Sequence, residues 1–183
     1  LSSAASDVYK RQEKYDVRVM LPKYMCMKDE WKEKLQYHTH FYMDLNWRKQ
    51  YVGVLEMEYD GIKFYFIDNE YYFNGYAPYG DMYADIEKFA FFSKAVLSAL
   101  PLIDFRPDII HCHDWQTGLV PIYLDNFRYG NEFYRGIKTV MTIHNLKFQG
   151  TWDPKRVRDI TGLPQYYFAP DKLEAYKDAN YLK

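Results

Sequence analysis

Apolar and polar positions alternate along two neighbouring stretches of the chain, residues 51–59 and 62–67, which are separated by Asp60 and Gly61. This period of two predicts a pair of half-buried strands. The Asp-Gly pair predicts a tight hairpin between them, because both central residues of the favoured two-residue turn adopt positive φ. The pattern therefore predicts an antiparallel hairpin in this part of the chain.

The segments around this hairpin are less regular. Residues 15–21 (YDVRVML) place apolar side chains on one face and predict a strand that ends at Pro22. The charged residues 28–34 predict a short, solvated helical turn. Residues 69–80 mix tyrosine and phenylalanine with Gly and Pro, which predicts an unusually aromatic loop.

Beyond this loop, apolar side chains recur at spacings of three and four residues between Ile86 and Leu100. That spacing predicts an amphipathic helix, with Asp81 as its N-cap and Pro101 as its end. A regular pattern follows: residues 107–112 predict a short buried strand, 115–127 a helix and 138–143 a second buried strand. Because such a unit needs a parallel sheet, the predicted fold class is α/β, with the antiparallel hairpin at one edge.

Charge and composition exclude several classes of function. Lys and Arg number 24 against 25 Asp and Glu, and this balance argues against a nucleic-acid partner. No apolar run is long enough for a transmembrane helix, which argues against a membrane partner. Two cysteines, Cys26 and Cys112, provide no disulfide framework, so we expect a cytoplasmic location.

Polar side chains follow both predicted parallel strands. His113 and Asp114 come after the first strand, and His144 and Asn145 come after the second. Because the carboxyl ends of parallel strands meet at one edge of a sheet, we expect these four residues to share a polar site. Asp114 has a second predicted role, as N-cap of the helix that begins near Trp115.

Four kinds of chemistry are open to such a site. His111 and His113 share a strand face and could bind a metal with Asp114 and His144, but neither outer-shell partners nor a water-activating base are evident. The sequence has no G-x-G-x-x-G motif and no P-loop, which disfavours NAD and ATP chemistry. Cys112 points away from both histidines, so we expect a packed, inert thiol.

Sugar binding is the fourth possibility. Carbohydrates are bound by planar polar side chains together with aromatic rings that contact the C–H face of the sugar. Asp114, His144 and Asn145 supply the polar groups, while Trp115 and the loop 71–83 supply aromatic rings. With 20 tyrosines the chain has many such rings, although half-buried strands also favour tyrosine.

The segment PDIIHCHDWQTGLVPIYL…KTVMTIHNLKFQG, within residues 107–150, closely resembles the bacterial glycogen synthases and plant starch synthases. DVRVMLPKY, GIKFYFIDNEYYF and the APYGD loop resemble the same family, so that the likeness covers residues 15–183. It implies the N-terminal, acceptor-side, Rossmann-like domain of a GT-B glycosyltransferase. Such enzymes transfer glucose from ADP-glucose to the non-reducing end of an α-1,4-glucan such as glycogen, with retention and without metal or another cofactor.

The resemblance also implies roles for individual residues. Asp114 would face the cleft and His144 would approach the transferred glucose, so these two are the predicted catalytic residues. The predicted substrate-binding residues lie in the same motifs or in the APYGD loop: Tyr79, His113, Trp115 and Asn145. Gln116 stands where some members have a histidine, and we assign it no catalytic role.

Departures from the family pattern concern both ends. We expect residues 1–12 to be a non-family leader and residues 13–183 to form a partial N-terminal domain. The family's K-T-G-G-L loop and its nucleotide-sugar domain are absent, and residues 170–183 resemble a helix without a stop signal. We therefore expect an enzyme fragment that is inactive and poorly soluble alone; a non-catalytic glucan-binding module is the alternative.

Overall fold

The computed structural model describes residues 15–183, so the predicted leader lies outside the described residues. The chain divides into two compact units. Unit 1 comprises residues up to Phe41 together with Val52–Pro78, and unit 2 comprises Tyr42–Tyr51 together with Tyr79–Lys183. The tip of one hairpin therefore belongs to unit 2, although its strands continue into unit 1.

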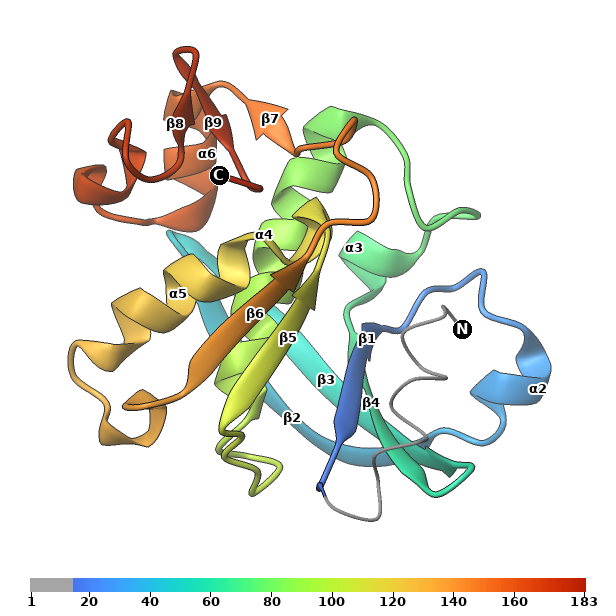
Figure 1. The fold of residues 1–183 in the computed structure, drawn as a ribbon. Coiled ribbons are helices and arrows are strands. Elements are labelled where there is room, and N and C mark those ends of the chain that lie inside the picture. The colour runs from blue at the N-terminus through green and yellow to red at the C-terminus, as the bar shows by residue number, and fades with distance from the viewer. Residues whose placement is uncertain (1–14) are drawn as a thin grey trace. The chain divides into compact units, whose positions relative to one another are not determined.

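A four-stranded sheet organises unit 1, and its strand order is β1-β4-β3-β2 (Figure 1). The strands are β1 (Arg18–Pro22), β2 (Gln36–Leu45), β3 (Arg48–Tyr59) and β4 (Ile62–Asp68). β1 runs parallel to β4, and β4 runs antiparallel to β3. Asp60 and Gly61 have φ of 52° and 74°, which confirms the predicted hairpin turn.

Other expectations for unit 1 need correction. β2 is absent from the sequence prediction, because its first half is polar and only Met43 and Leu45 are buried. The charged helical turn is confirmed as α2 (Asp29–Lys32), which buries no residue. The expected loop after β4 contains a helical turn, α3 (Glu70–Phe73), which forms because the Asn69 side chain accepts a hydrogen bond from the Tyr72 N–H.

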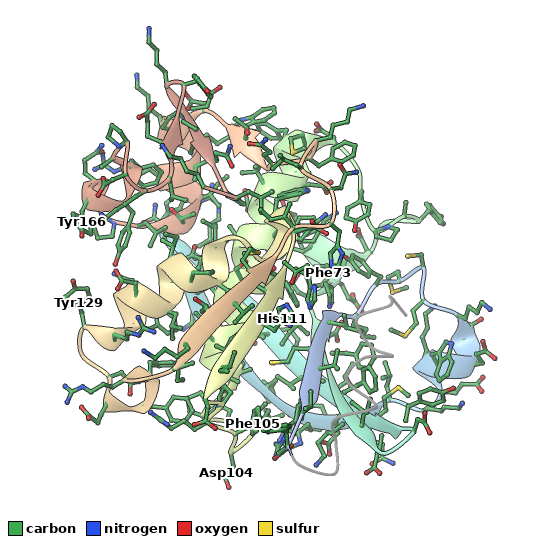
Figure 2. The ribbon with its side chains drawn as sticks, in the orientation of Figure 1. Phe73, Asp104, Phe105, His111, Tyr129 and Tyr166 are labelled. Carbon is green, nitrogen blue, oxygen red and sulfur yellow. The ribbon has the colours of Figure 1, made fainter. Side chains whose placement is uncertain are left out.

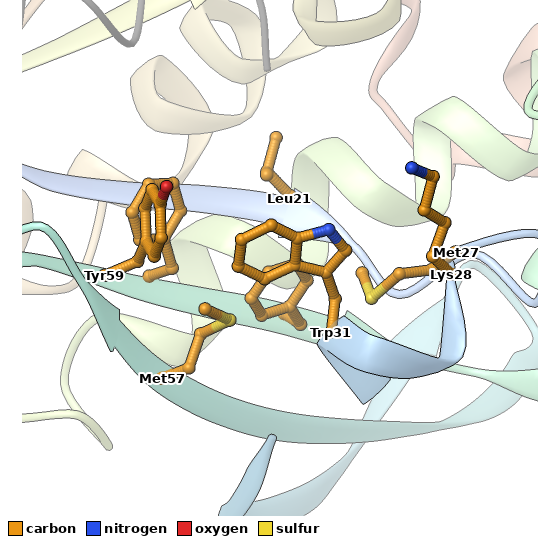
Figure 3. Close-up of a pocket in the computed structure, with 8 residues that line it drawn as sticks. Leu21, Met27, Lys28, Trp31, Met57 and Tyr59 are labelled. Carbon is orange, nitrogen blue, oxygen red and sulfur yellow. The ribbon is translucent and has the colours of Figure 1, made fainter. Parts of the chain in front are cut away.

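An apolar cluster covers one face of the unit 1 sheet. Met57, Ile62, Phe64 and Phe66 are buried, and Trp31 of α2 packs against them. A groove of about 410 Å³ remains beside Trp31, and Figure 3 shows its lining of methionine, leucine and aromatic side chains with Lys28 at the rim. This lining is apolar and brings together no group of titratable side chains.

In unit 2 the longest helix is α4 (Met82–Ala99). The Asp81 side chain accepts a hydrogen bond from the Tyr83 N–H, which confirms the predicted N-cap. More of the α4 surface is buried than the predicted amphipathic pattern implies, because Phe91, Phe92 and Ser93 are buried on neighbouring sides of the helix. The reason is that both α5 and α6, whose bounds follow, pack against it.

The predicted strand-helix-strand unit is present. β5 (Ile109–His113) pairs in parallel with β6 (Lys138–Thr142), and α5 (Leu119–Arg128) lies between them in the sequence. A 3-10 turn, η1 (Trp115–Thr117), precedes α5, and η2 (Glu132–Tyr134) follows it. The α/β class is therefore confirmed, but the expected full burial of both strands is wrong, since Ile109 is 57% exposed and Val140 47%.

The C-terminal segment also differs from expectation. It contains β7 (Thr151–Trp152), α6 (Pro154–Thr161), η3 (Gln165–Phe168), β8 (Glu174–Ala175) and β9 (Asp178–Asn180). The short strands form a sheet in the order β7-β9-β8, so the helix expected over residues 170–183 is wrong. Its reversal uses Tyr176 and Lys177, both at positive φ, where the sequence has no glycine to signal a turn. None of the helices in residues 15–183 is long and apolar enough to cross a membrane.

Candidate functional site

The carboxyl ends of β5 and β6 bring three histidine rings together, as their positions in the sequence predict. His113 Nδ1 lies 3.1 Å from His144 Nε2, and the two rings are nearly parallel at 13°. The His111 ring is 4.3 Å from that of His113, and His111 Nε2 contacts the Thr142 hydroxyl at 2.7 Å. Figure 2 labels His111 on β5. The histidines thus form a row along one strand face.

Asp114 ties the two strand ends together through its carboxylate. Its Oδ1 accepts hydrogen bonds from the backbone N–H groups of His144, at 2.7 Å, and Asn145, at 3.2 Å. The predicted role of Asp114 as a helix cap is wrong, because its side chain makes no capping hydrogen bond to η1. The backbone φ of 56° at Asp114 accompanies this different orientation, a left-handed conformation that aspartate tolerates better than most residues. The carboxylate therefore fixes the backbone that carries His144.

Thr117 binds the backbone of His113 at the end of β5, and the sequence analysis did not predict this role. Its hydroxyl accepts a hydrogen bond from the His113 N–H at 2.7 Å and donates to the His113 carbonyl at 2.9 Å. A threonine four residues after the end of a strand is a known signal for such a local bond, but it is a weak one. The backbone of His113 is thus held by Thr117, as that of His144 is held by Asp114.

The surroundings of His113 favour a neutral ring. Partial burial lowers its pKa, and the nearby His111 and His144 lower it further, against an opposing effect of the Asp114 carboxylate. In the contact between His113 and His144 one ring must donate a proton and the other must accept it. With the His113 ring neutral, its second nitrogen can still form a hydrogen bond with a hydroxyl group.

Cys112 takes no part in this site. The thiol is 1% exposed on the opposite strand face from the histidines, and burial raises its pKa to about 12. Because the thiolate is the reactive form, this cysteine is inert at neutral pH, as the alternation along the strand predicts.

Trp115 and Tyr79 differ in their access to solvent. Trp115 is only 4% exposed, with its ring 5.0 Å from Phe89 and 6.3 Å from Tyr181. The expectation that Trp115 offers an open ring to a sugar is therefore wrong, because this ring belongs to the core of unit 2. Tyr79 is 58% exposed, and burial of its hydroxyl together with the charges of Asp114 and Asp85 raises its pKa.

Metal binding finds no support among the described residues. No group of three or more His, Cys, Asp or Glu side chains within residues 15–183 has a geometry that could hold a metal ion. The rings of His113 and His144 contact each other, and the carboxylate that lies beside them accepts bonds from backbone N–H groups. What the arrangement offers is directional hydrogen bonding to a neutral polar ligand.

Polar groups at the carboxyl ends of parallel strands are a feature that the GT-B glycosyltransferases share with other open α/β sheets. The chain superposes on the catalytic domain of Starch Synthase IV from Arabidopsis thaliana, solved with ADP and acarbose, with a TM-score of 0.76. The superposition covers 94% of this chain and 36% of that one at 24% sequence identity, so the likeness concerns the fold.

Residues 7–183 match the model of the starch synthase catalytic domain, and the chain belongs to this family. It is 68% identical over 175 residues to the glycogen synthase of Lachnoclostridium phytofermentans, and 68% identical over 170 residues to that of Lachnospira eligens. These alignments cover 96% and 93% of this chain but 37% and 36% of the relatives. The chain thus spans little more than a third of the curated relatives it matches.

Proposed function

We propose that the chain forms the acceptor-side part of a glucosyltransferase that transfers glucose from ADP-glucose to the non-reducing end of an α-1,4-glucan, with retention of anomeric configuration. The observation that carries this proposal is the histidine pair His113–His144, whose backbone is held in place by Asp114 and Thr117. Transfer depends on groups that are already oriented before the reaction begins, because reorganisation then costs nothing during the step.

Each residue of the site has a proposed task. His144 contacts the glucose that is transferred, and His113 fixes the orientation and tautomer of its ring through the 3.1 Å contact. The Asp114 carboxylate holds His144 and Asn145 through their backbone N–H groups. Asn145 Oδ1 accepts a bond from the Lys147 N–H, so the NH₂ group of its amide is the part proposed to bind the sugar. The Tyr79 hydroxyl, whose ordinary pKa is already far above neutral and is raised further by burial, is protonated and acts as a hydrogen-bond donor.

The substrates are proposed from the relatives. The two bacterial relatives are named glycogen synthases, which supports a glucan acceptor. The structural neighbour was solved with ADP and acarbose, which supports an adenine nucleotide sugar as donor and an oligosaccharide as acceptor. The free thiols Cys26 and Cys112 accord with action in the cytoplasm.

The 183-residue chain alone is expected to be inactive. Departure of the nucleoside diphosphate requires positive charge near the developing negative charge. Within residues 15–183 the partners of His113, Asp114 and His144 are histidine, threonine and backbone groups, with no lysine or arginine among their hydrogen bonds. The charge must come from other parts of a complete enzyme.

A chimera tests the proposal directly. Residues 7–183 replace the matching segment of the Lachnoclostridium relative, and a coupled assay follows ADP release from ADP-glucose with glycogen as acceptor. We expect turnover by the chimera, none by the isolated chain, and a normal rate for the matched control Tyr129→Ala, which alters a side chain that is 78% exposed. A folded chimera that binds glycogen without releasing ADP would contradict the proposal and favour a non-catalytic glucan-binding module.

A further inference from the structure

A buried carboxylate on α4 is bonded to the loop that carries Tyr79. The carboxylate belongs to Asp85, which lies near the start of the helix. The Gly80 N–H donates a hydrogen bond to Asp85 Oδ2 at 3.0 Å. Because Gly80 directly follows Tyr79 in the sequence, this bond ties the backbone beside the tyrosine to the helix.

The charge of Asp85 is balanced by a lysine on the same helix. Lys88 donates to Asp85 Oδ1 at 2.6 Å, and the side chains of Lys88 and Asp85 are only 12% and 4% exposed. A buried ion pair of this kind adds little net stability, because the removal of both charges from water offsets much of their attraction. The pair does fix the position of the carboxylate, and its second oxygen accepts the bond from the Gly80 N–H.

The ring of Tyr79 is also contacted by α4. Its centroid lies 6.2 Å from that of Phe89, which comes one helical turn after Asp85. Phe89 is buried, and its ring meets that of Trp115 edge to face at 5.0 Å. The helix therefore contacts both the loop of Tyr79 and the residue that follows Asp114.

The Tyr79 hydroxyl lies close enough to Asp114 to be affected by its charge. Burial raises the pKa of this hydroxyl, and the negative charges of Asp114 and Asp85 raise it further. More than half of the Tyr79 surface is nevertheless exposed, so the contact with Phe89 restrains the ring only in part. A bond to the adjacent backbone supplies the additional restraint that a precisely placed hydroxyl needs.

We propose that Asp85 is a positioning residue for glucose transfer: it holds the Gly80 N–H and thereby places the Tyr79 hydroxyl for its hydrogen bond to the substrate. The inference rests on the proposed function, in which Tyr79 is that donor. Both oxygens of Asp85 are engaged by Gly80 and Lys88, so its effect reaches the substrate through the loop. Misplacement of a substrate-positioning group by about 1 Å can lower a rate about 100-fold, so such a restraint has a measurable consequence.

A matched pair of double variants of the chimera tests this role. The apolar pair, Asp85→Leu/Lys88→Met, removes both charges and the acceptor of the Gly80 N–H. The amide pair, Asp85→Asn/Lys88→Gln, removes the charges but keeps a side-chain oxygen as acceptor. Mass spectrometry of a peptide that spans Gly80 measures the exchange of its amide hydrogen. We expect exchange at least about fivefold faster in the apolar pair and close to the wild-type rate in the amide pair.

Turnover separates positioning from structural support. We expect the apolar pair to lower kcat/KM for ADP-glucose about tenfold, as Tyr79→Phe does, and the amide pair to restore most of this loss. In the Tyr79→Phe background the apolar pair should cost no more than about twofold, because the hydroxyl that Asp85 positions is already gone. A purely structural role would make the two losses additive. Circular dichroism of each variant verifies that it is folded.

Asp85→Glu is a further variant, which keeps both charges. Its extra methylene displaces the carboxylate from the Gly80 N–H, so we expect faster exchange and a lower kcat/KM here as well. Wild-type exchange at Gly80 in the apolar pair or in Asp85→Glu would overturn the inference. Equal activity of the apolar and amide pairs would also overturn it, and so would additive losses with Tyr79→Phe. If the unsubstituted chimera has no turnover, the proposed function fails, and the exchange at Gly80 still decides whether Asp85 holds the loop.

Discussion

Two groups of histidines, one in each unit, use a carboxylate in opposite ways. In unit 1, His38 Nδ1 lies 3.1 Å from Glu56 Oε2. The rings of His38 and Tyr65 contact each other edge to face, with an angle of 81° between their planes. In unit 2, the Asp114 carboxylate bonds to the backbone N–H of His144, and the rings of His113 and His144 contact each other. The Glu56 carboxylate faces the ring of its histidine, whereas the Asp114 carboxylate bonds to the backbone.

The difference shows how a histidine is made available to a ligand. The His38 ring faces a carboxylate on the neighbouring strand and packs against the Tyr65 ring, so its role is structural. The His144 ring is positioned through its backbone and through its contact with His113, and its second ring nitrogen remains for a partner. The four predictions that follow test this contrast, beginning with the largest expected effect.

Alanine at His144 and at His38 should have opposite consequences. In the chimera we expect His144→Ala to lower turnover at least about 100-fold, because this ring is the group proposed to contact the transferred sugar. Stability should change little, since the ring is exposed. His38→Ala should keep turnover within about twofold of that of the unsubstituted chimera. It should lower the free energy of unfolding by about 1 kcal/mol. ADP release and urea unfolding measure the two effects, and equal losses of turnover would remove the contrast.

Asp114→Ala should reduce turnover nearly as much as the loss of His144. Its carboxylate holds two N–H groups, and a displacement of the His144 backbone by about 1 Å can cost about 100-fold in rate. Asp114→Asn is the matched control, because its side-chain oxygen can accept the same bonds and asparagine tolerates positive φ. Equal rates for the alanine and asparagine variants would show that the bonds to His144 and Asn145 do not matter.

Thr117→Val should act mainly on stability. The His113 N–H would lose its acceptor, and an unsatisfied, partly buried donor costs about 1–3 kcal/mol. Thr117→Ser keeps the hydroxyl and should restore most of the loss. Urea unfolding of the chimera measures both, and a valine variant as stable as the wild type would exclude this role for the hydroxyl.

The smallest expected effect is on the pH dependence of stability. The pKa of His113 is lowered in the folded chain, so at mildly acidic pH the unfolded chain binds more protons there than the folded chain does. Stability should therefore be at its full value above the unfolded pKa of about 6.5 and fall as the pH decreases toward the folded pKa. His113→Asn should flatten this part of the profile, and an unchanged slope in thermal melts between pH 5 and 7 would contradict it.

Local turn chemistry explains which parts of the fold could be predicted. The turn at Asp60-Gly61 carries a glycine at positive φ and was predicted correctly. The turn at Tyr176-Lys177 has positive φ at both residues without any glycine, and the sequence around it wrongly predicts a helix. The second reversal is imposed by packing of the strands β8 and β9, and a single sequence carries no signal for that.

The candidate site divides in a similar way. The meeting of His113, Asp114, His144 and Asn145 could be predicted, because parallel strands end at a common edge. The bonding of Asp114 to the backbone and the burial of Trp115 could not be predicted. The bonding of Asp114 depends on the φ angle of that one residue. The burial of Trp115 depends on Tyr181, which is distant from it in the sequence.

Tyr181 has a consequence for synthesis on the ribosome. Its buried hydroxyl donates to the Ile86 carbonyl at 3.1 Å, its ring packs beside Trp115, and its carbonyl occupies the space where a Cβ on Gly118 would lie. Helix α4 and Trp115 leave the ribosome well before Tyr181, and at about 5–20 residues per second their apolar surfaces wait for seconds without this partner. During that interval the apolar surfaces of α4 and Trp115 stay exposed, and they are covered only when Tyr181 has emerged from the ribosome.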